Sequence, residues 1–107
     1  MSGMEQHFRE LDEIGYTVME DVLKPGQIEE AIAALKESYT EEHVSAHEPG
    51  TSRTHNLTAR AEIFREIIQV PRVVACMEYL LGEDYILSDM GARSPMPGKE
   101  PQGLHRD

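Results

Sequence analysis

The stretch PRVVACMEYLLGEDYILSDMGAR, residues 71–93, decides the fold class because it passes from a helical pattern to a strand pattern. Pro71 suits the start of a helix, and the apolar run after it predicts a short helix that ends at Gly82. Residues 84–93, DYILSDMGAR, follow as a candidate strand. The chain therefore turns from helix to strand near residue 83, which predicts an α+β fold.

Two more helices and a strand are predicted on the amino-terminal side. Residues 4–14 repeat apolar side chains at helical spacing, and Gly15 can take the left-handed conformation that ends a helix. Residues 15–23, GYTVMEDVL, alternate in hydropathy and predict a half-buried strand. Residues 24–42 predict a second helix, with Pro25 in its first turn. Its apolar stripe, which is expected to pack in the core, consists of Ile28, Ile32, Leu35 and Tyr39.

The remaining segments complete the expected order. Residues 43–56 hold turn formers without periodicity and predict a long loop, and residues 58–70 return to helical spacing. Residues 94–103 form a connection rich in Pro and Gly, after which LHRD, residues 104–107, would begin the next strand. A helical front end thus leads into a β region that has only begun at Asp107.

Charge and composition exclude several classes of function. Ten basic residues against twenty acidic ones give a formal net charge of -10 over 107 residues. Such a field repels nucleic acids and anionic membrane surfaces, so neither is an expected partner. The lone cysteine, Cys76, lies in an apolar run and is expected to be a buried small hydrophobe. Without an apolar signal region or a run long enough to span a membrane, a cytoplasmic location is expected.

The last residues carry the chemistry of most interest. In an extended strand, side chains alternate between faces, so His105 and Asp107 would point the same way and Arg106 the opposite way. An imidazole and a carboxylate side by side are two of the three ligands of a 2-His-1-carboxylate iron site. The bare motif also arises by chance at an exposed chain end, so its context has to decide.

Three segments in the right order supply that context: residues 8–35, FRELDEIGYTVMEDVLKPGQIEEAIAAL, residues 51–89, and MPGKEPQGLHRD, residues 96–107. Together they resemble the phytanoyl-CoA dioxygenase family of Fe(II)/2-oxoglutarate-dependent oxygenases. Members open with a helix, a Gly-Tyr-hydrophobic strand and a Pro-initiated helix. They approach the metal through Pro-Gly, a Gln and Leu-His-x-Asp. The resemblance covers nearly the whole chain.

The resemblance implies roles for individual residues. His105 and Asp107 would be the first two iron ligands, and Arg53 falls where relatives often have a basic residue that reaches the cosubstrate. Ser88 and Ala92 fall on the strand that lines the cosubstrate pocket. Some relatives have amide side chains there; Ser88 could still donate a hydrogen bond, whereas Ala92 could not.

The family's third iron ligand, a distal His, and the Arg that pairs with 2-oxoglutarate lie well downstream of the Asp and are absent from these 107 residues. The family fold is a double-stranded β-helix, or jelly roll. The resemblance therefore implies an incomplete jelly roll, truncated at the first metal-binding motif. Residues 1–107 would be the amino-terminal portion of a single dioxygenase domain, with a helical support region over about 1–82 and the first strands over about 83–107.

The chemistry implied by the resemblance is that of a small-molecule hydroxylase. The cofactors would be Fe(II), 2-oxoglutarate as cosubstrate and ascorbate as a candidate reductant. Dioxygen and a small-molecule substrate would be the partners, and the products would include succinate and CO2. Asp107 preserves the carboxylate ligand, which favours hydroxylation over halogenation. With two of three ligands, this chain alone is expected to have little or no turnover.

Two other interpretations stay open. His43 and His47, four residues apart, could chelate zinc on a helix, although a polar solvated loop fits Pro49 and Gly50 better. His7 and His55 are expected to be isolated and exposed. From a different functional class, the chain could be a non-catalytic acidic helical interaction module with an incidental HRD terminus. Substrate identity and oligomeric state are not encoded in a recognisable pattern.

Overall fold

The computed structural model describes residues 3–41, 51–95, 98 and 104, with the backbone alone described at 40, 41, 51–53 and 95. Four α-helices, one 3-10 helix and two strands occur in this part of the chain. They are α1 (Glu5–Ile14), α2 (Pro25–Glu41), β1 (Thr51–Thr54), η1 (Leu57–Ala59), α3 (Glu62–Ile67), α4 (Pro71–Leu81) and β2 (Ala92–Pro95). The helical part of the predicted α+β class is confirmed.

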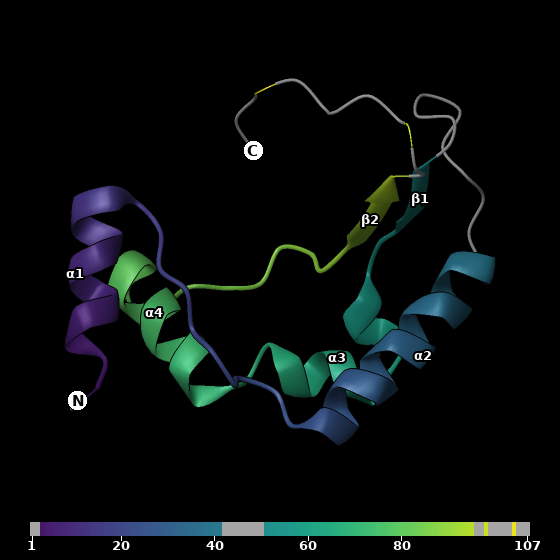
Figure 1. The fold of residues 1–107 in the computed structure, drawn as a ribbon, viewed down its shortest axis with the longest axis horizontal. Helices are drawn as coiled ribbons and strands as arrows, with labels where there is room; N and C mark the ends of the chain where they lie inside the picture. Colours follow the sequence, from purple (N-terminus) through teal and green to yellow (C-terminus); the bar gives the residue numbers. More distant parts are fainter. Residues whose placement is uncertain (1–2, 42–50, 96–97, 99–103, 105–107) are drawn as a thin grey trace.

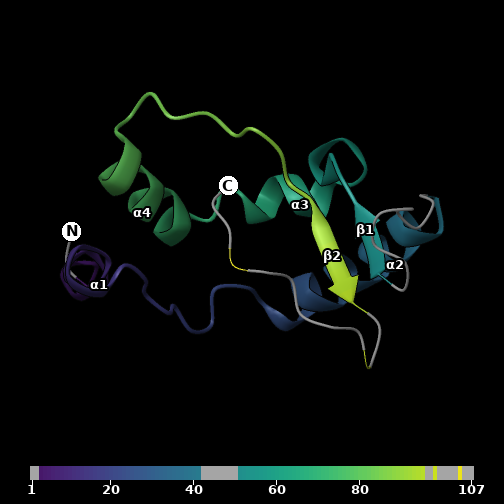
Figure 2. The same ribbon diagram turned by 90° about the horizontal axis from the view of Figure 1, so that it is seen from above.

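The elements gather in two groups, which Figures 1 and 2 show from perpendicular directions. Helices α1 and α4 lie side by side at one end, and α2, α3 and η1 lie with the two strands at the other. Two long irregular segments join the groups, one between α1 and α2 and one between α4 and β2, and the short turn over residues 68–70 joins α3 to α4.

The buried core belongs to the second group. Leu57, Ile63 and Phe64 are each at most 3% exposed and form one cluster. Partly buried apolar side chains pack around it from α2, α3 and the β2 region: Ala31, Ala34, Leu35, Ala61, Ile67, Met90 and Ala92. This cluster fixes the position of the strands, because β2 contributes Ala92 directly to it.

The first group is held by a smaller set of contacts. Phe8 of α1 stacks on Tyr79 of α4 with ring centroids 4.2 Å apart, and the Tyr79 hydroxyl donates a hydrogen bond to Asp12. Met4 and Cys76 are each 3% exposed. The expectation that Cys76 is a buried hydrophobe is confirmed.

The helix ends follow the sequence closely. Gly15 ends α1 in the left-handed conformation, with φ of 84°, and donates its N–H to the Glu10 carbonyl. At the start of α2, Gln27 accepts a hydrogen bond from the Lys24 backbone N–H, which is half of a capping box. Pro71 opens α4 and Gly82 follows its last residue, as predicted.

The predicted strand over residues 15–23 is wrong. This segment is irregular, and Asp21 has a left-handed φ of 53°, which breaks an extended run. The Thr17 hydroxyl instead donates to Glu10 and hydrogen-bonds the ring of His7, both on α1. His7 is therefore half-buried and bonded rather than isolated and exposed.

Other boundaries also need correction. Residues 51–54 lie in the predicted loop but form β1, and of the predicted strand over 84–93 only its last two residues belong to β2. The helix expected over 58–70 is split into η1 and α3, because Ala61 between them is extended. In the α2 stripe, Ile28 and Ile32 remain 46% and 49% exposed, so they do not join the core.

The sheet consists of one antiparallel ladder, β1 with β2. Its register pairs Thr51 with Pro95, Ser52 with Ser94, Arg53 with Arg93, and Thr54 with Ala92. Within the described residues there is one two-stranded sheet and no barrel, so the jelly-roll part of the prediction is not shown. The same part of the chain contains no helix with both the length and the apolar character needed to cross a bilayer.

Replacing Gly91 by Ala is expected to destabilise the ladder. A Cβ at Gly91 would lie 2.8 Å from the Thr54 carbonyl oxygen, which is backbone and cannot move without shifting β1. We expect a loss of about 1–3 kcal/mol in the free energy of unfolding, measured by urea denaturation. Gly26→Ala is the matched control, since a Cβ there has nothing within 4 Å and the residue is helical. Equal effects of the two substitutions would contradict this close approach.

Candidate functional site

The β ladder has two faces of different character. The Thr54–Ala92 and Ser52–Ser94 pairs alternate with the Arg53–Arg93 pair along the strands. Thr54 is fully buried, Ala92 packs on the core, and the Ser94 hydroxyl hydrogen-bonds Tyr39 of α2 at 2.8 Å. This face is therefore directed towards the helices.

Arg53 and Arg93 belong to the opposite face. They are direct partners in the register, so their Cβ positions are about 4.5–5.5 Å apart by the geometry of antiparallel pairs. Of Arg53 the backbone alone is described, whereas the Arg93 side chain is half-buried and takes part in an interaction within the chain.

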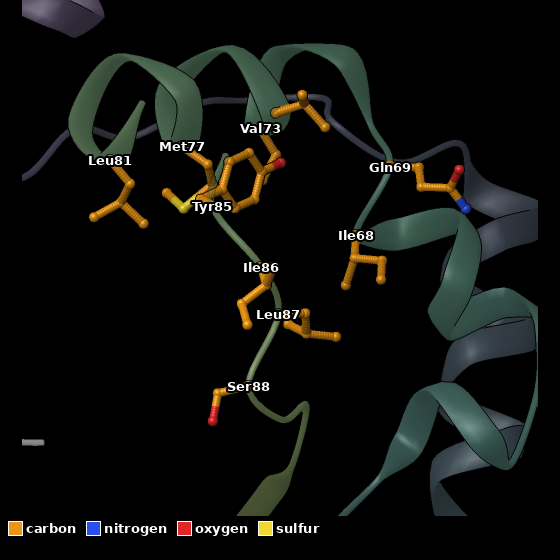
Figure 3. Close-up of a pocket in the computed structure, with 10 residues that line it drawn as sticks. Ile68, Gln69, Val73, Met77, Leu81, Tyr85, Ile86, Leu87 and Ser88 are labelled. Atoms are coloured by element: carbon orange, nitrogen blue, oxygen red, sulfur yellow. The ribbon is translucent and has the colours of Figure 1, made fainter. Parts of the chain in front are cut away.

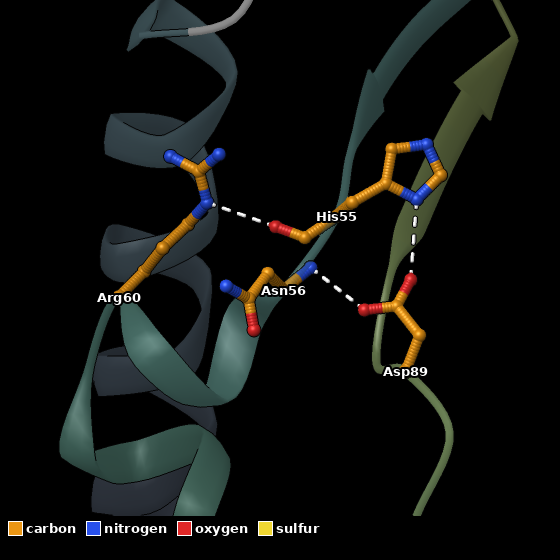
Figure 4. A network of polar contacts seen from close by, with 4 residues as sticks. All are labelled: His55, Asn56, Arg60 and Asp89. Atoms are coloured by element: carbon orange, nitrogen blue, oxygen red, sulfur yellow. Dashed lines mark hydrogen bonds and ion pairs between the residues drawn. The ribbon is translucent and has the colours of Figure 1, made fainter.

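A polar network closes the end of the ladder beside this face (Figure 4). The carboxylate of Asp89 bonds two partners: Oδ2 lies 3.2 Å from Nδ1 of His55, and Oδ1 accepts the Asn56 backbone N–H at 2.9 Å. Arg60 donates Nε–H to the His55 carbonyl at 3.0 Å. Asn56 has a left-handed φ of 56°, which Asn tolerates better than most residues. The network ties the segment before β2 to the end of β1.

The electrostatics of this network favour a charged Asp89. The Asn56 N–H, followed by the hydrogen bond with His55, lowers the pKa of the Asp89 carboxyl below its ordinary value. The His55 and Asp89 side chains are 57% and 44% exposed, so water screens their attraction and the ion pair itself contributes little. Its main effect is to orient the imidazole, as carboxylates do for proton-transferring or metal-bound histidines. The expectation that His55 is isolated is therefore wrong.

An apolar hollow of about 440 Å³ lies between α4 and the segment that follows it (Figure 3). Its lining includes Val73, Met77 and Leu81 of α4, with Tyr85, Ile86 and Leu87 opposite them. Gln69 and Ser88 add polar groups at its margin. The volume is that of a small-molecule pocket, and the lining is mostly apolar, as in many such pockets.

The residues implied in cosubstrate binding, and Ala92 on the same expected strand, lie in different local surroundings. Ser88 lines the apolar hollow and is exposed. Ala92 lies on the helix-directed face of β2 and packs on the core, so it does not line a pocket. Arg53 lies in β1, where its backbone alone is described.

The candidate metal ligands His105 and Asp107 lie outside the described residues, as do His43 and His47. Within the described part of the chain, no three side chains of His, Cys, Asp or Glu form a group that could hold a metal ion. The described side chains by themselves therefore do not make an iron site.

Sequence reasoning missed Arg93, Asp89 and the pairing of each with its partner. No local pattern could have found them, because His55 meets Asp89 and Arg53 meets Arg93 only after β1 and β2 pair. The useful signal is non-local: two short polar segments, Thr51–Thr54 and Ala92–Pro95, each with Arg at a matching position.

Comparison of the chain with protein-family models, with curated proteins and with solved structures finds no match.

Asp89 is expected to contribute to stability at neutral pH and to lose that contribution in acid. Its folded pKa lies below the ordinary value of 3.8, so the contribution is complete above that pH and disappears as pH falls through the folded pKa. Asp89→Asn should lower stability at pH 7 and flatten the acid limb of a stability–pH profile, measured by thermal denaturation. Asp84→Asn, in the exposed turn after α4, is the matched control. Identical profiles for wild type and Asp89→Asn would refute the role of this carboxylate.

Proposed function

We propose that residues 1–107 are the amino-terminal portion of a non-haem Fe(II)/2-oxoglutarate-dependent dioxygenase resembling the phytanoyl-CoA dioxygenase family. The intact enzyme hydroxylates a small molecule and releases succinate and CO2. The observation that carries this proposal is the ordered set of sequence segments that ends in His105-x-Asp107, downstream of β2.

The shape of the β region supports the proposal. A two-stranded ladder is marginal by itself and gains stability from more strands or from a covering layer. Here α2 and the core cluster cover one face of the ladder. A jelly roll that starts from this ladder would therefore already have helices packed on one of its faces.

Exposed apolar surface also supports the view that further chain packs on this one. Ile86 is 86% exposed and Leu81 65% exposed, and both border the apolar hollow. A contiguous apolar surface of this kind usually marks an interface. In the proposed enzyme, later strands of the jelly roll cover it.

The residues have the following proposed roles. His105 and Asp107 would hold Fe(II), and the bound iron would supply the activation of dioxygen that oxidises 2-oxoglutarate. Arg53 attracts a carboxylate of the cosubstrate, and Ser88 donates a hydrogen bond near it. The rest of the protein supplies the second His and the Arg that complete the site. The helical core keeps β2 in place, so the segment that leads to His105 starts from a fixed strand.

One alternative is favoured by a specific observation. Ile28 and Ile32 leave an apolar stripe exposed on α2, and helices with such stripes dock on partners. A non-catalytic helical interaction module would use this surface and would not need His105 or Asp107. Iron binding by the protein translated from the whole reading frame separates the two functions.

We expect that protein to bind one Fe(II) and to develop the visible absorption of a 2-oxoglutarate chelate under anaerobic conditions. Asp107→Ala should weaken iron retention by at least about a hundredfold, because it removes a direct ligand. Arg106→Gln is the control, since residue 106 would point away from the two ligands if residues 104–107 form the expected strand. Iron content that is unchanged by Asp107→Ala would end the oxygenase proposal and favour the interaction module.

The isolated 107-residue chain is expected to self-associate or to melt with low cooperativity, since its apolar hollow lacks the covering strands. Sedimentation velocity and thermal denaturation measure this. Leu81→Lys with Ile86→Lys should reduce the association, whereas Glu13→Lys on α1 should not. A monomeric chain with one sharp transition would count against the proposal.

A further inference from the structure

We propose that residues 85–88, YILS, form an open strand edge that accepts one added β-strand. The apolar side chains of that strand fill the hollow beside α4, and its basic end lies next to Glu83 and Asp84. In the proposed enzyme the added strand belongs to the later part of the same polypeptide. Only this identification of its source rests on the proposed function, because the edge itself is made of described residues.

The backbone of the segment is the first argument. Residues 85–91 contain no helix or turn, and none of residues 85–90 has a positive φ, so the segment is compatible with a strand. Within the part of the chain that the structure describes, no hydrogen bond involves the N–H or carbonyl groups of residues 85–88. A row of such groups without a protein partner is what an added strand pairs with.

Continuity with the ladder is the second argument. Residues 85–91 run directly into β2, as Figures 1 and 2 show. Pairing of this run with the β1 side ends at Met90, whose carbonyl accepts the Leu57 N–H. Residues 85–88 therefore extend past the end of their partner, and no strand among the described residues lies beside them. An added strand would continue a sheet that already has a fixed register.

The side chains indicate which kind of strand fits. Tyr85, Ile86 and Leu87 line the hollow of about 440 Å³ together with Met77 and Leu81 of α4 (Figure 3). Ile86 is 86% exposed and Leu87 48% exposed, so water covers this apolar surface unless another segment of chain packs on it. Removal of apolar surface from water is the main favourable term in such docking. One face of the added strand is therefore apolar.

Charge decides what lies at the end of that strand. Glu83 and Asp84 directly precede the segment and are exposed, and neither has a polar partner among the described residues. In a chain with a formal net charge of -10, this acidic pair favours a basic neighbour. At the other end of the segment, the Asp89 carboxylate is already engaged by His55 and the Asn56 N–H. The complementary charge therefore belongs at the Glu83 end.

The test adds a blocked peptide, Lys-Val-Thr-Val-Thr-Val-Lys, in excess to the dilute 107-residue chain at constant ionic strength. Lys stands at both ends so that either strand direction can be used. Amide signals of Ile86, Leu87 and Ser88 report binding, and we expect saturable shifts with a Kd on the order of millimolar. The same peptide with its internal N–H groups methylated keeps the side chains and loses the donors. It should bind at least about tenfold more weakly.

Charge exchange tests the basic end. Glu83→Lys with Asp84→Lys should weaken binding of the Lys-flanked peptide by about threefold or more, and should strengthen binding of a Glu-flanked peptide. A folding defect would weaken both peptides, so the reciprocal response separates a lost contact from a damaged fold. Glu29→Lys with Glu30→Lys, the same charge change at exposed positions of α2, is the matched control and should leave both affinities unchanged.

The inference is overturned if the peptide gives no saturable shifts at residues 86–88, or if the control pair on α2 has the same effect as the pair at 83 and 84. Equal binding of the methylated peptide would also overturn it, because the hollow would then take apolar groups without strand pairing. These outcomes leave the iron measurement on the intact protein untouched. Intact protein that binds no iron while the chain binds the peptide would end the oxygenase proposal alone.

Discussion

The pairing of Thr51–Thr54 with Ala92–Pro95 is the constraint on which the rest of the structure depends. It joins two segments that are far apart in sequence and gives them a shared register. Next to the ladder, the Leu57 N–H bonds the Met90 carbonyl at 2.8 Å and the Asn56 N–H bonds Asp89. Because side chains alternate along a strand, this register sets Thr54 and Ala92 on the core side of the ladder and Arg93 on the other side.

The packing explains why the ladder holds with so few strands. A core of Leu57, Ile63 and Phe64 fills the angle between α2, α3 and the ladder, and Ala92 extends it to β2. Helices α1 and α4 are held together by the stack of Phe8 on Tyr79 and by the hydrogen bond from the Tyr79 hydroxyl to Asp12. That hydrogen bond raises the pKa of the Tyr79 hydroxyl. The short turn between α3 and α4 and two longer irregular segments connect the two groups. The second group holds the strands, and α4 of the first group forms one wall of the apolar hollow.

Local patterns in the sequence predicted the helices well. Gly15, Pro71 and Gly82 fixed helix ends because each has a backbone preference that needs no tertiary contact. The strands were predicted poorly because β1 is the polar run TSRT, which lacks the alternation of a half-buried strand. The segment GYTVMEDVL has that alternation but has no partner strand among the described residues. Strand pairing, rather than the propensity of each segment, decided both outcomes.

The candidate site shows the same difference between local and non-local information. A single residue such as Arg53 could be named from the sequence. Arg93 and the His55–Asp89 pair could be found only once the pairing of β1 with β2 was known.

Nuclear Overhauser effects between backbone protons of the two strands measure this register most directly. Cross-strand contacts are expected to join Arg53 to Arg93 and Thr54 to Ala92. A register shifted by one residue would place Arg53 opposite Ala92 or Ser94 and exchange the two faces of one strand. Contacts of that kind, or none between the strands, would contradict it.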